Sequence, residues 1–436
     1  MKIFVVGSGG REHVLAEKYS QSKKVDIVFV ASGNILMPET NKKIQIIPNL
    51  LATDLKDLLT FARKQKIDLV DIAADDQLAA GYVDAFRKSG INAFGPSKIA
   101  AEIEWNKVWA RKFMEKYNLP TPLFKSFSSE QKAISFINSH NEQLWYIKAS
   151  GLAAGKGAIR AETKNDAIQA IKFMKQFGTA GKTFVIEEGM IGEEFSLFAL
   201  CDGNTYKILG TAQDHKTVSD NDKGPNTGGM GCVSPTGSLN SSSIRTIEKE
   251  ILRPFMNGMK KERRPYTGIL YLGGMISNPP TGGGIRIIEF NARWGDPEAE
   301  VVLSGLQNDY LDIVTATFNQ QLSKITIKSD DKIRISIAGC SRGYPEDYTK
   351  VKGKIIRGLE KAQRSKGIKI YGAGIKKVGK NYVVTGGRIF HLVAEGATIR
   401  EARKRAYKAM GLIGVEGNNL HYRTDIGWRE LERTVR

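Results

Sequence analysis

Apolar and polar residues follow two different rhythms over the first hundred residues. Short apolar runs, typical of buried strands, are separated by longer segments in which apolar residues recur at helical spacing. The predicted strands are Ile3–Val6, Val25–Val30, Ile44–Ile47, Ile67–Ile72 and Ile91–Phe94. Strands that alternate with helices form a parallel, doubly wound sheet, so we expect an N-terminal α/β domain over residues 1–100.

Residues 101–325 are predicted to form a second, larger domain with a small lid near its start. One helix is expected from the N-cap Ser97 to Lys116, followed by a proline-containing linker at 118–122. The lid, residues 123–190, is predicted as an α+β unit. It has strands Leu144–Ala149, Ala158–Ala161 and Thr183–Glu188 and a helix that ends at Phe173.

The pattern beyond the lid predicts further strands and one long polar segment. The strands are Phe195–Leu200, Ile269–Met275 and Ile285–Phe290. Residues 217–231 are glycine-rich and too polar to pack as core, so we expect a long functional loop. Residues 326–436 are predicted as a C-terminal α/β module, with strands near Ile333–Gly339 and Arg388–Ala394 and a helix from Thr398 to Ile413.

Charge and cysteine content narrow the class of protein. The 436 residues have room for roughly three domains. The formal net charge of +19 favours an anionic partner, but the basic residues are spread along the chain without a basic and aromatic stripe, so we expect neither nucleic acid nor membrane binding.

The chain has three cysteines, Cys201, Cys232 and Cys340, which lack CxxC spacing. The absence of this spacing argues against a cysteine zinc site and against a disulfide framework. Without a signal peptide or an apolar run of about 18 residues, the expected location is the cytoplasm.

The first strand leads into a glycine-rich turn that can bind a phosphate. The run Gly7-Ser8-Gly9-Gly10-Arg11-Glu12 departs from the dinucleotide fingerprint, because Glu12 stands where a third glycine would allow close helix packing. A helix N-terminus with free N–H groups and Arg11 beside it still suits one phosphate monoester. The alternative is a plain tight turn.

Two carboxylates follow the fourth strand, at the end of the sheet where ligands of open α/β folds bind. Asp75 and Asp76 are therefore candidates to hold ribose hydroxyls. The alternative is that Asp76 only caps the next helix.

A second glycine-rich run lies between two predicted strands of the lid. Lys148 to Gly157 is one residue short of a Walker A motif and ends in glycine where Ser or Thr would bind magnesium. We interpret it as a hairpin that closes over polyphosphate, with Lys148, Gly155 and Lys156 at the phosphates. A surface hairpin without a ligand is the alternative.

Acidic residues mark the end of the lid. Glu187 and Glu188 end a strand, and Glu193 and Glu194 follow closely. A backbone hinge there can contact an adenine edge, with a carboxylate accepting from ribose hydroxyls. A solvated strand end is the alternative.

The run from Ile287 to Glu298 carries the most specific local chemistry. Side chains alternate across a strand, so Glu289, Asn291 and Arg293 are expected on one face. Carboxylate and amide oxygens suit Mg²⁺, and a guanidinium suits a transferring phosphoryl group. The sequence therefore predicts a magnesium–phosphate centre, with a solvated strand face as the alternative.

The polar segment between the lid and this strand can cover a substrate. It contains Asp214, His215 and Lys216, followed by Thr227, Gly228 and Gly229. Such a segment can order over a reactive intermediate and exclude water. With no serine or cysteine partner in sight, His215 is expected to bind or position substrate.

Together these motifs resemble the glycinamide ribonucleotide synthetases, a family of the ATP-grasp superfamily. The match runs nearly end to end, and its most specific part is Gly-Pro-Asn-Thr-Gly-Gly-Met-Gly at 224–231. The resemblance implies an ATP-grasp fold with an N-terminal pre-ATP-grasp domain and a C-terminal module. It also implies a ligase of purine biosynthesis in which ATP phosphorylates glycine and the amine of 5-phosphoribosylamine attacks the glycyl phosphate. ATP and Mg²⁺, or Mn²⁺, are the expected cofactors, and a monomer is the expected state.

The resemblance also implies roles for individual residues. Lys107 and Lys148 would contact ATP phosphates, Glu187 and Glu188 would lie at the adenine hinge, and Glu193 or Glu194 would bind the ribose. Glu289 and Asn291 would bind magnesium, and Arg293 would neutralise the acyl phosphate. Residues facing phosphoribosylamine would be Gly9, Gly10 and the segment Asp214, His215 and Lys216.

Three positions depart from the family pattern. Ala74-Asp75-Asp76 stands where Gly-Pro-Glu is usual, Ser150 replaces an Asp, and Trp294 replaces a common Phe. The first of these keeps open another ATP-grasp ligase or carboxylase that acts on a different nucleotide. A basic nucleotide-binding protein that has lost catalysis is the other alternative, although the metal and phosphate residues are intact.

Overall fold

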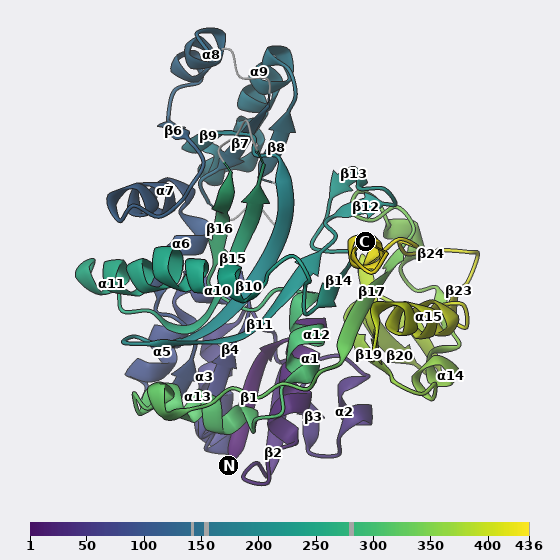
Figure 1. Ribbon diagram of the computed structural model, residues 1–436. Coiled ribbons are helices and arrows are strands. Elements are labelled where there is room, and N and C mark those ends of the chain that lie inside the picture. Colours follow the sequence, from purple (N-terminus) through teal and green to yellow (C-terminus); the bar gives the residue numbers. More distant parts are fainter. Residues whose placement is uncertain (141–143, 152–156, 279–282, 436) are drawn as a thin grey trace.

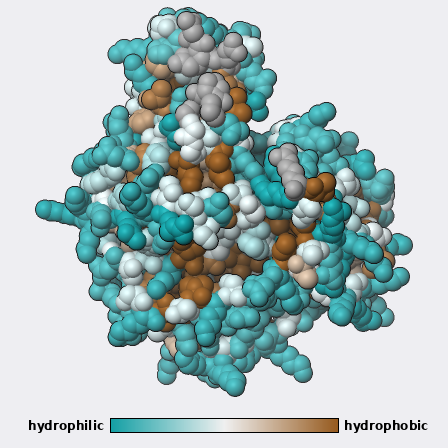
Figure 2. All heavy atoms as spheres, viewed as in Figure 1, coloured by the Kyte–Doolittle hydropathy of each residue, from teal (hydrophilic) through white to brown (hydrophobic). Residues whose placement is uncertain are grey.

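The chain folds into a central body, a lobe that projects from it and a C-terminal part beside the body (Figure 1). The computed structural model describes residues 1–140, 144–151, 157–278 and 283–435. In the space-filling view of Figure 2, a notch separates the projecting lobe from the C-terminal part. Within the described residues, no helix is both long and apolar enough to cross a membrane.

The N-terminal residues form the predicted parallel sheet. Its strands run in the order β3-β2-β1-β4-β5, and every neighbouring pair is parallel. They are β1 (Lys2–Gly7), β2 (Ile27–Ser32), β3 (Ile44–Ile46), β4 (Leu69–Ile72) and β5 (Asn92–Phe94), with helices α1 (Gly10–Ser20), α2 (Met37–Thr40), α3 (Leu55–Gln65), α4 (Asp75–Ala80) and α5 (Tyr82–Lys88). The strand order reverses between β1 and β4, which creates a crevice at their carboxyl ends.

The predicted helix over 97–116 is wrong in one respect, because it consists of two helices. Ser97 caps α6 (Lys98–Trp105) by accepting from the amide of Ala100, as expected. Asn106 has φ −96° and ψ 81°, and its side chain accepts from the amide of Trp109, so it ends α6 and caps α7 (Lys107–Lys116). An asparagine that bonds its own backbone competes with helix continuation. Lys107 therefore lies in the first turn of α7.

The projecting lobe has a sheet and a core of its own. Its antiparallel sheet runs in the order β6-β9-β7-β8, with α8 (Glu130–Asn138), α9 (Lys164–Phe173) and the 3₁₀ segment η1 (Met174–Gly181) packed on it. The strands are β6 (Phe124–Phe127), β7 (Trp145–Ala149), β8 (Ala158–Ala161) and β9 (Phe184–Glu188). Apolar side chains of these elements form a cluster separate from the rest of the core, which suits a lid that moves as a unit.

A long antiparallel sheet connects the body with the C-terminal part. Its order is β16-β15-β10-β11-β14-β17-β22-β19, with β24 beside β17. The strands are β10 (Gly192–Asp202), β11 (Tyr206–Asp214), β14 (Gly231–Ser234), β15 (Thr267–Ser277), β16 (Gly284–Asn291), β17 (Ile333–Ser341), β19 (Ile368–Gly372), β22 (Arg388–Gly396) and β24 (Leu420–His421). Because β14 pairs with β17, the sheet continues from the larger domain into the C-terminal residues.

The expectation of one long loop at 217–231 is wrong, because these residues form a hairpin and the start of a strand. The hairpin joins β12 (Thr217–Ser219) to β13 (Lys223–Asn226). Buried Arg423 fixes it by donating to the carbonyl of Thr217 and to Asp222. Polar residues thus form regular structure here because the C-terminal residues provide their partners.

Helices and a small second sheet complete the C-terminal part. The small sheet contains β18 (Ile355–Arg357), β20 (Ile375–Val378), β21 (Asn381–Val384) and β23 (Gly414–Val415). The helices are α14 (Leu359–Gln363), α15 (Ile399–Met410) and α16 (Trp428–Arg433), with the short 3₁₀ turn η4 (Thr349–Val351). Thr398 caps α15 where the predicted helix begins.

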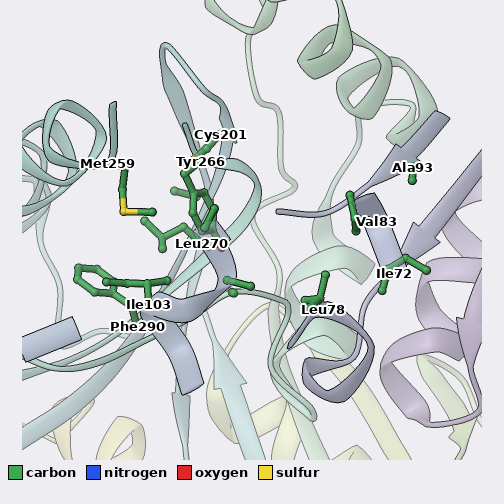
Figure 3. Close-up of a cluster of buried hydrophobic side chains, with 14 of the residues drawn as sticks. Ile72, Leu78, Val83, Ala93, Ile103, Cys201, Met259, Tyr266, Leu270 and Phe290 are labelled. Atoms are coloured by element: carbon green, nitrogen blue, oxygen red, sulfur yellow. The ribbon is translucent and has the colours of Figure 1, made fainter. Parts of the chain in front are cut away.

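The main apolar core lies where the N-terminal sheet meets the larger domain (Figure 3). Leu78 and Val83 come from α4 and α5, Ile103 from α6 and Phe290 from β16, and all are buried. This core also includes residues of α10 (Ser241–Ile247), η2 (Glu248–Leu252) and α11 (Arg253–Lys261). The helices α12 (Glu298–Gly305) and α13 (Tyr310–Phe318) and the segment η3 (Leu322–Lys324) belong to a second core, which they form with α1 and the other face of β1. The two domains therefore share both cores, which fixes the end of β16 relative to the crevice of the parallel sheet.

Candidate active site

Three lysines surround one carboxylate on β16. Lys107 Nζ lies 2.7 Å from Glu289 Oε2. Partial burial opposes ionisation of Glu289, but the positive charges of Lys107, Lys216 and Lys148 hold its pKa far below the usual range. Glu289 is therefore a permanent anion among cations from α7, from the turn after β11 and from β7, an arrangement that suits phosphate groups and a metal ion.

Lys148 is held in place by a buried ion pair across the lid sheet. Its ammonium lies 2.7 Å from Glu187 Oε2, and Arg111 donates to both oxygens of Glu187 at 2.6 and 2.7 Å. Burial would raise the pKa of Glu187, but Arg111 and Lys148 lower it to about 2. The Glu187 carboxylate is thus committed to these two cations.

The predicted adenine hinge is partly occupied by pairing within the protein. Glu188 donates its amide to the carbonyl of Leu123, accepts from the Leu123 amide at 3.0 Å, and is followed by Gly189, whose amide donates to Leu144. The structure therefore brings Glu187 and Glu188 to the junction of the lid and the linker. There the Glu187 carboxylate pairs with Arg111 and Lys148, and the Glu188 carboxylate accepts from the Leu123 amide.

Glu193 and Glu194 begin β10 and have different partners. Gln213 Nε2 donates to Glu193 Oε1 at 2.6 Å, and Arg433 from α16 pairs with the same carboxylate. Lys216 Nζ lies 2.9 Å from Glu194 Oε2. The charge of Glu194 raises the pKa of Lys216 well above its usual value, although burial opposes the shift, so Lys216 is a fixed cation.

A second charged cluster lies at the crevice between β1 and β4. Arg293 pairs with Glu104 at 2.9 Å, and Asp75 lies in the field of Arg293 and Arg11. Burial opposes the charge of Asp75, but the two arginines hold its pKa below the usual value. Arg11 donates to Glu12 and to the carbonyl of Trp294, which links this crevice to the end of β16. Asp76 is exposed beside this cluster, and partial burial of its carboxyl and the charge of Asp75 raise its pKa.

Arg293 does not continue the strand face that the sequence predicts. β16 ends at Asn291, and Arg293 lies in the bend that follows. Its guanidinium pairs with Glu104 and donates to the carbonyl of Trp294 at 3.0 Å. Burial opposes its charge, but the nearby charges of Glu104, Asp75 and Glu298 raise the pKa of Arg293 above the usual range. Glu289 and Asn291 do share one face of β16, as expected.

The glycine turn at 227–229 is clamped by the C-terminal part. Arg388 donates to the carbonyls of Gly228 and Asp296, and the Gly228 amide donates to the hydroxyl of Tyr344. Thr227 bonds the carbonyl of Lys216 through its hydroxyl. A Cβ on Gly229 would lie 2.5 Å from Pro297 and 3.0 Å from Asp214 Oδ1, so the turn needs glycine there.

Asp214 is a buried carboxyl with an altered pKa. Burial and the nearby charge of Glu298 raise its pKa well above the usual value, although Lys216 opposes the shift. Tyr271 donates to Glu298 at 2.7 Å, which places an acid, a hydroxyl and a cation around Asp214.

His215 has a different environment from its sequence neighbours. Its Nε2 accepts from the amide of Gly427 at 3.2 Å. Burial, followed by the charges of Arg423 and Arg429, lowers its pKa to about 3, so the ring is neutral. The structure brings His215 to the C-terminal residues and not to the lysine cluster.

Gly9 and Gly10 begin α1, but the helix end is already partly occupied. The Gly9 amide donates to Glu12 Oε2 at 2.8 Å. A Cβ on Gly10 would lie 2.3 Å from Glu300 Oε1, so only glycine fits. Gly155 and Lys156 lie outside the described residues.

Sequence reasoning missed several residues of these clusters: Glu104, Arg111, Tyr271, Glu298 and Arg388. One of them had a readable signal, because Arg111 lies four residues after Lys107 and therefore on the same face of α7. The others depend on contacts between distant segments.

Three family models match consecutive parts of the chain. They describe the phosphoribosylglycinamide synthetase N domain (residues 1–104), ATP-grasp (A) domain (105–299) and C domain (335–429). A phosphoribosylamine–glycine ligase of Streptococcus pneumoniae is 40% identical over 438 residues, covering 99% of this chain and 100% of that protein. The ligase of the same name from Caldanaerobacter subterraneus is 38% identical, covering 98% and 99%.

Solved structures give the same picture. The crystal structure of a phosphoribosylamine–glycine ligase from Thermotoga maritima is similar with a TM-score of 0.81 and 29% identity, covering 98% of this chain and 100% of that one. The biotin carboxylase domain of a Hydrogenobacter thermophilus 2-oxoglutarate carboxylase, solved with ADP and magnesium, has a TM-score of 0.71 at 13% identity, covering 97% of this chain and 91% of that one. At that identity the second likeness concerns the fold alone, which is the mixed α/β ATP-grasp fold.

Proposed function

Because this chain belongs to the phosphoribosylglycinamide synthetase family along nearly its whole length, we propose how its own residues carry out the ligation of glycine to 5-phosphoribosylamine. In that reaction the γ-phosphoryl group of ATP is transferred to the glycine carboxylate, and ADP leaves. The amine then attacks the carbonyl carbon of the glycyl phosphate, and phosphate leaves with formation of the amide of glycinamide ribonucleotide. The convergence of three lysines on Glu289 is the observation that carries the assignment of residues.

The ATP phosphates are assigned to the lysine cluster. Lys107 belongs to α7, Lys148 to β7 of the lid, and Lys216 to the turn after β11. Ser150 supports Lys107, because its hydroxyl accepts from the amide of Val108 and donates to Asn106. Ser150 thus joins the base of the lid loop to the start of α7.

The residues on β16 fit a magnesium ion. Glu289 and Asn291 present a carboxylate that stays ionised and an amide oxygen on one strand face, and both are hard oxygen donors. When bound, Mg²⁺ supplies neutralisation of phosphate charge. Gly273 lies opposite Glu289 in the sheet, where its missing side chain leaves that face open.

The reacting carboxylate is assigned to the space between the two charged clusters. Arg293 follows the metal strand directly and is held by Glu104, so its guanidinium can neutralise the acyl phosphate. Asp214, with its raised pKa, is assigned to the amine, from which it can take a proton. The roof of this space is the clamped turn of Thr227, Gly228 and Gly229, which limits access of water to the intermediate.

Phosphoribosylamine is assigned to the crevice of the parallel sheet. Gly9, Gly10 and Arg11 offer a helix N-terminus and a guanidinium for its phosphate, and Asp75 offers a carboxylate for its ribose hydroxyls. Asp75 stands where the family usually has Pro, so it adds a carboxylate to the pocket. His215 is assigned to positioning Asp214 and Lys216 through the C-terminal residues.

Glu193 and Glu194 are assigned to the ATP ribose, and Glu187 and Glu188 to the adenine hinge. The domain limits we propose are 1–100, 101–325 with the lid at 123–190, and 326–436. The buried, free cysteines support a cytoplasmic location, and we propose a monomer.

Replacing Glu289 tests this assignment. Glu289→Gln removes the charge that faces the lysines, and turnover should fall by at least about 10³-fold if a metal ligand of the reacting phosphate is lost. Glu262→Gln is the matched control, because Glu262 pairs with Lys116 on the surface of α7 much as Glu289 pairs with Lys107. Both variants should keep the circular dichroism of the parent chain. A Glu289→Gln enzyme as active as the control would overturn the assignment.

A further inference from the structure

A buried group of metal-ligating side chains lies apart from the lysine cluster. Asp296 precedes α12, Glu300 lies in α12, and His391 lies on β22. One potential ligand atom of each lies within 4.8 Å of the others. His391 Nε2 is 3.0 Å from Asp296 Oδ1 and 4.0 Å from Glu300 Oε1, and the Glu300 and His391 side chains are fully buried.

Several polar atoms of this group lack hydrogen-bond partners among the described residues. Both oxygens of Glu300 and Nδ1 of His391 are without one, and His391 Nε2 has only its close contacts with the two carboxylates. Leaving a buried donor or acceptor unpaired costs about 1–3 kcal/mol, and more for a charged group. Such a concentration of unpaired atoms calls for an explanation such as a bound ion.

Protonation alone does not satisfy these atoms. Burial and the charge of Asp296 raise the pKa of Glu300, but a neutral Glu300 would still leave acceptors and a ring nitrogen unpaired. Arg388 Nη1 lies 3.2 Å from Asp296 Oδ1 and balances one of the two carboxylates. The same Oδ1 faces His391 Nε2, and each carboxylate oxygen has about two lone pairs, so Oδ1 can accept from the guanidinium with one and bind an ion with the other. A cation between the three side chains would pair with all of them.

We propose that Asp296, Glu300 and His391 bind one divalent transition-metal ion of the Zn²⁺ type. Zinc binds imidazole nitrogen and carboxylate oxygen at about 2.0–2.2 Å, so two ligand atoms at a tetrahedral angle are about 3.4 Å apart. The two measured separations, 3.0 and 4.0 Å, lie on either side of that value. One imidazole and two carboxylates leave a fourth position for water.

The ion would join three parts of the chain. Asp296 and Glu300 belong to the larger domain and His391 to the C-terminal part, while Gly10 of α1 packs directly against the group. A Cβ at Gly10 would lie 2.3 Å from Glu300 Oε1 and 2.6 Å from His391 Cδ2. The site is therefore structural, and it is distinct from the magnesium strand at Glu289 and Asn291.

Metal uptake by the untagged 436-residue chain tests the proposal. After removal of metals with a chelator, the wild type should bind one Zn²⁺ per chain and should give the visible absorption of tetrahedral Co²⁺ when cobalt is added. Its thermal midpoint should rise with Zn²⁺ but not with the same concentration of Mg²⁺. Absence of stoichiometric uptake by the wild type would overturn the proposal, whatever the variants do.

Variants locate the ion. Glu300→Gln and His391→Gln should each weaken Zn²⁺ binding by at least about tenfold, since even residues behind the ligands change affinity by that much. Glu289→Gln and His140→Gln, which alter the magnesium strand and a histidine of the lid, should bind Zn²⁺ like the wild type. Uptake that survives Glu300→Gln and His391→Gln, or that is lost in Glu289→Gln, would show that the ion binds elsewhere.

Discussion

Replacing Arg111 with methionine should destabilise the protein strongly, because it leaves a buried carboxylate without its main partner. Arg111 and Glu187 have side chains that are 4% and 3% exposed. Arg111 donates to both oxygens of Glu187 and also to the carbonyl of Ile288 at 2.7 Å. Methionine fills a similar volume but donates no hydrogen bond.

The expected cost follows from these contacts. Removing one partner of a buried pair costs about 3–5 kcal/mol, because the remaining charge stays buried and unpaired. Lys148 remains 2.7 Å from Glu187 and limits the loss, so we expect about 3 kcal/mol in the free energy of unfolding. Lys148 is then the only cation paired with Glu187, so the KM for ATP should rise as well.

The assay is equilibrium unfolding in urea, with the intrinsic fluorescence of the protein as the signal. Lys116→Met is the control, since Lys116 lies on the same helix but pairs with Glu262 on the surface, where it should contribute nothing measurable. Adding Glu187→Gln to Arg111→Met should restore part of the stability, because it removes the unpaired charge. An Arg111→Met variant as stable as Lys116→Met would refute the reasoning.

Three further predictions concern other parts of the molecule. Burial raises the pKa of Asp71 to about 7, above its value in the unfolded chain, so the stability of the wild type should fall as pH rises from about 4 to 7. In urea titrations at pH 8, the free energy of unfolding of Asp71→Asn should exceed that of the wild type by on the order of 4 kcal/mol at most. The same dependence of stability on pH in both proteins would contradict this. Gly10→Ala should lower the free energy of unfolding by about 1–3 kcal/mol, because the added Cβ clashes with Glu300. Gly411→Ala, whose added Cβ would have its nearest neighbour at 3.5 Å, should lower it far less, and thermal unfolding compares the two variants. Asp75→Asn should raise the KM for phosphoribosylamine about tenfold and leave that for ATP unchanged in steady-state kinetics, and an unchanged KM for phosphoribosylamine would remove Asp75 from that pocket.

The local elements of the fold were readable because each has a local physical cause. The strands of the parallel sheet are short apolar runs, and Ser97 and Thr398 cap helices at the predicted positions. The helix break at Asn106 was equally local, since its side chain bonds the backbone three residues on, but the apolar spacing continued across it and hid the break. The hairpin at 217–226 was not readable, because its partner Arg423 lies about 200 residues away in sequence.

The candidate site shows the same division. Glu289 and Asn291 could be placed on one face because alternation along a strand fixes it. Arg293 could not be placed, because β16 ends before it and its side chain is oriented by Glu104 from α6, a distant segment of the chain. The environment of His215 was also beyond the sequence, since the amide that it accepts from belongs to Gly427. Residue type and spacing therefore predict the kind of chemistry at the site. Contacts between distant segments decide which side chains lie together there.

The central claim is that this chain joins glycine to phosphoribosylamine and converts ATP to ADP and phosphate in the process. It is tested most directly by ADP release from the purified protein with ATP, Mg²⁺, glycine and freshly made phosphoribosylamine, each omitted in turn. We predict release that requires both glycine and phosphoribosylamine, with glycinamide ribonucleotide formed in equal amount. ATP binding without ADP release in the complete mixture would contradict the claim.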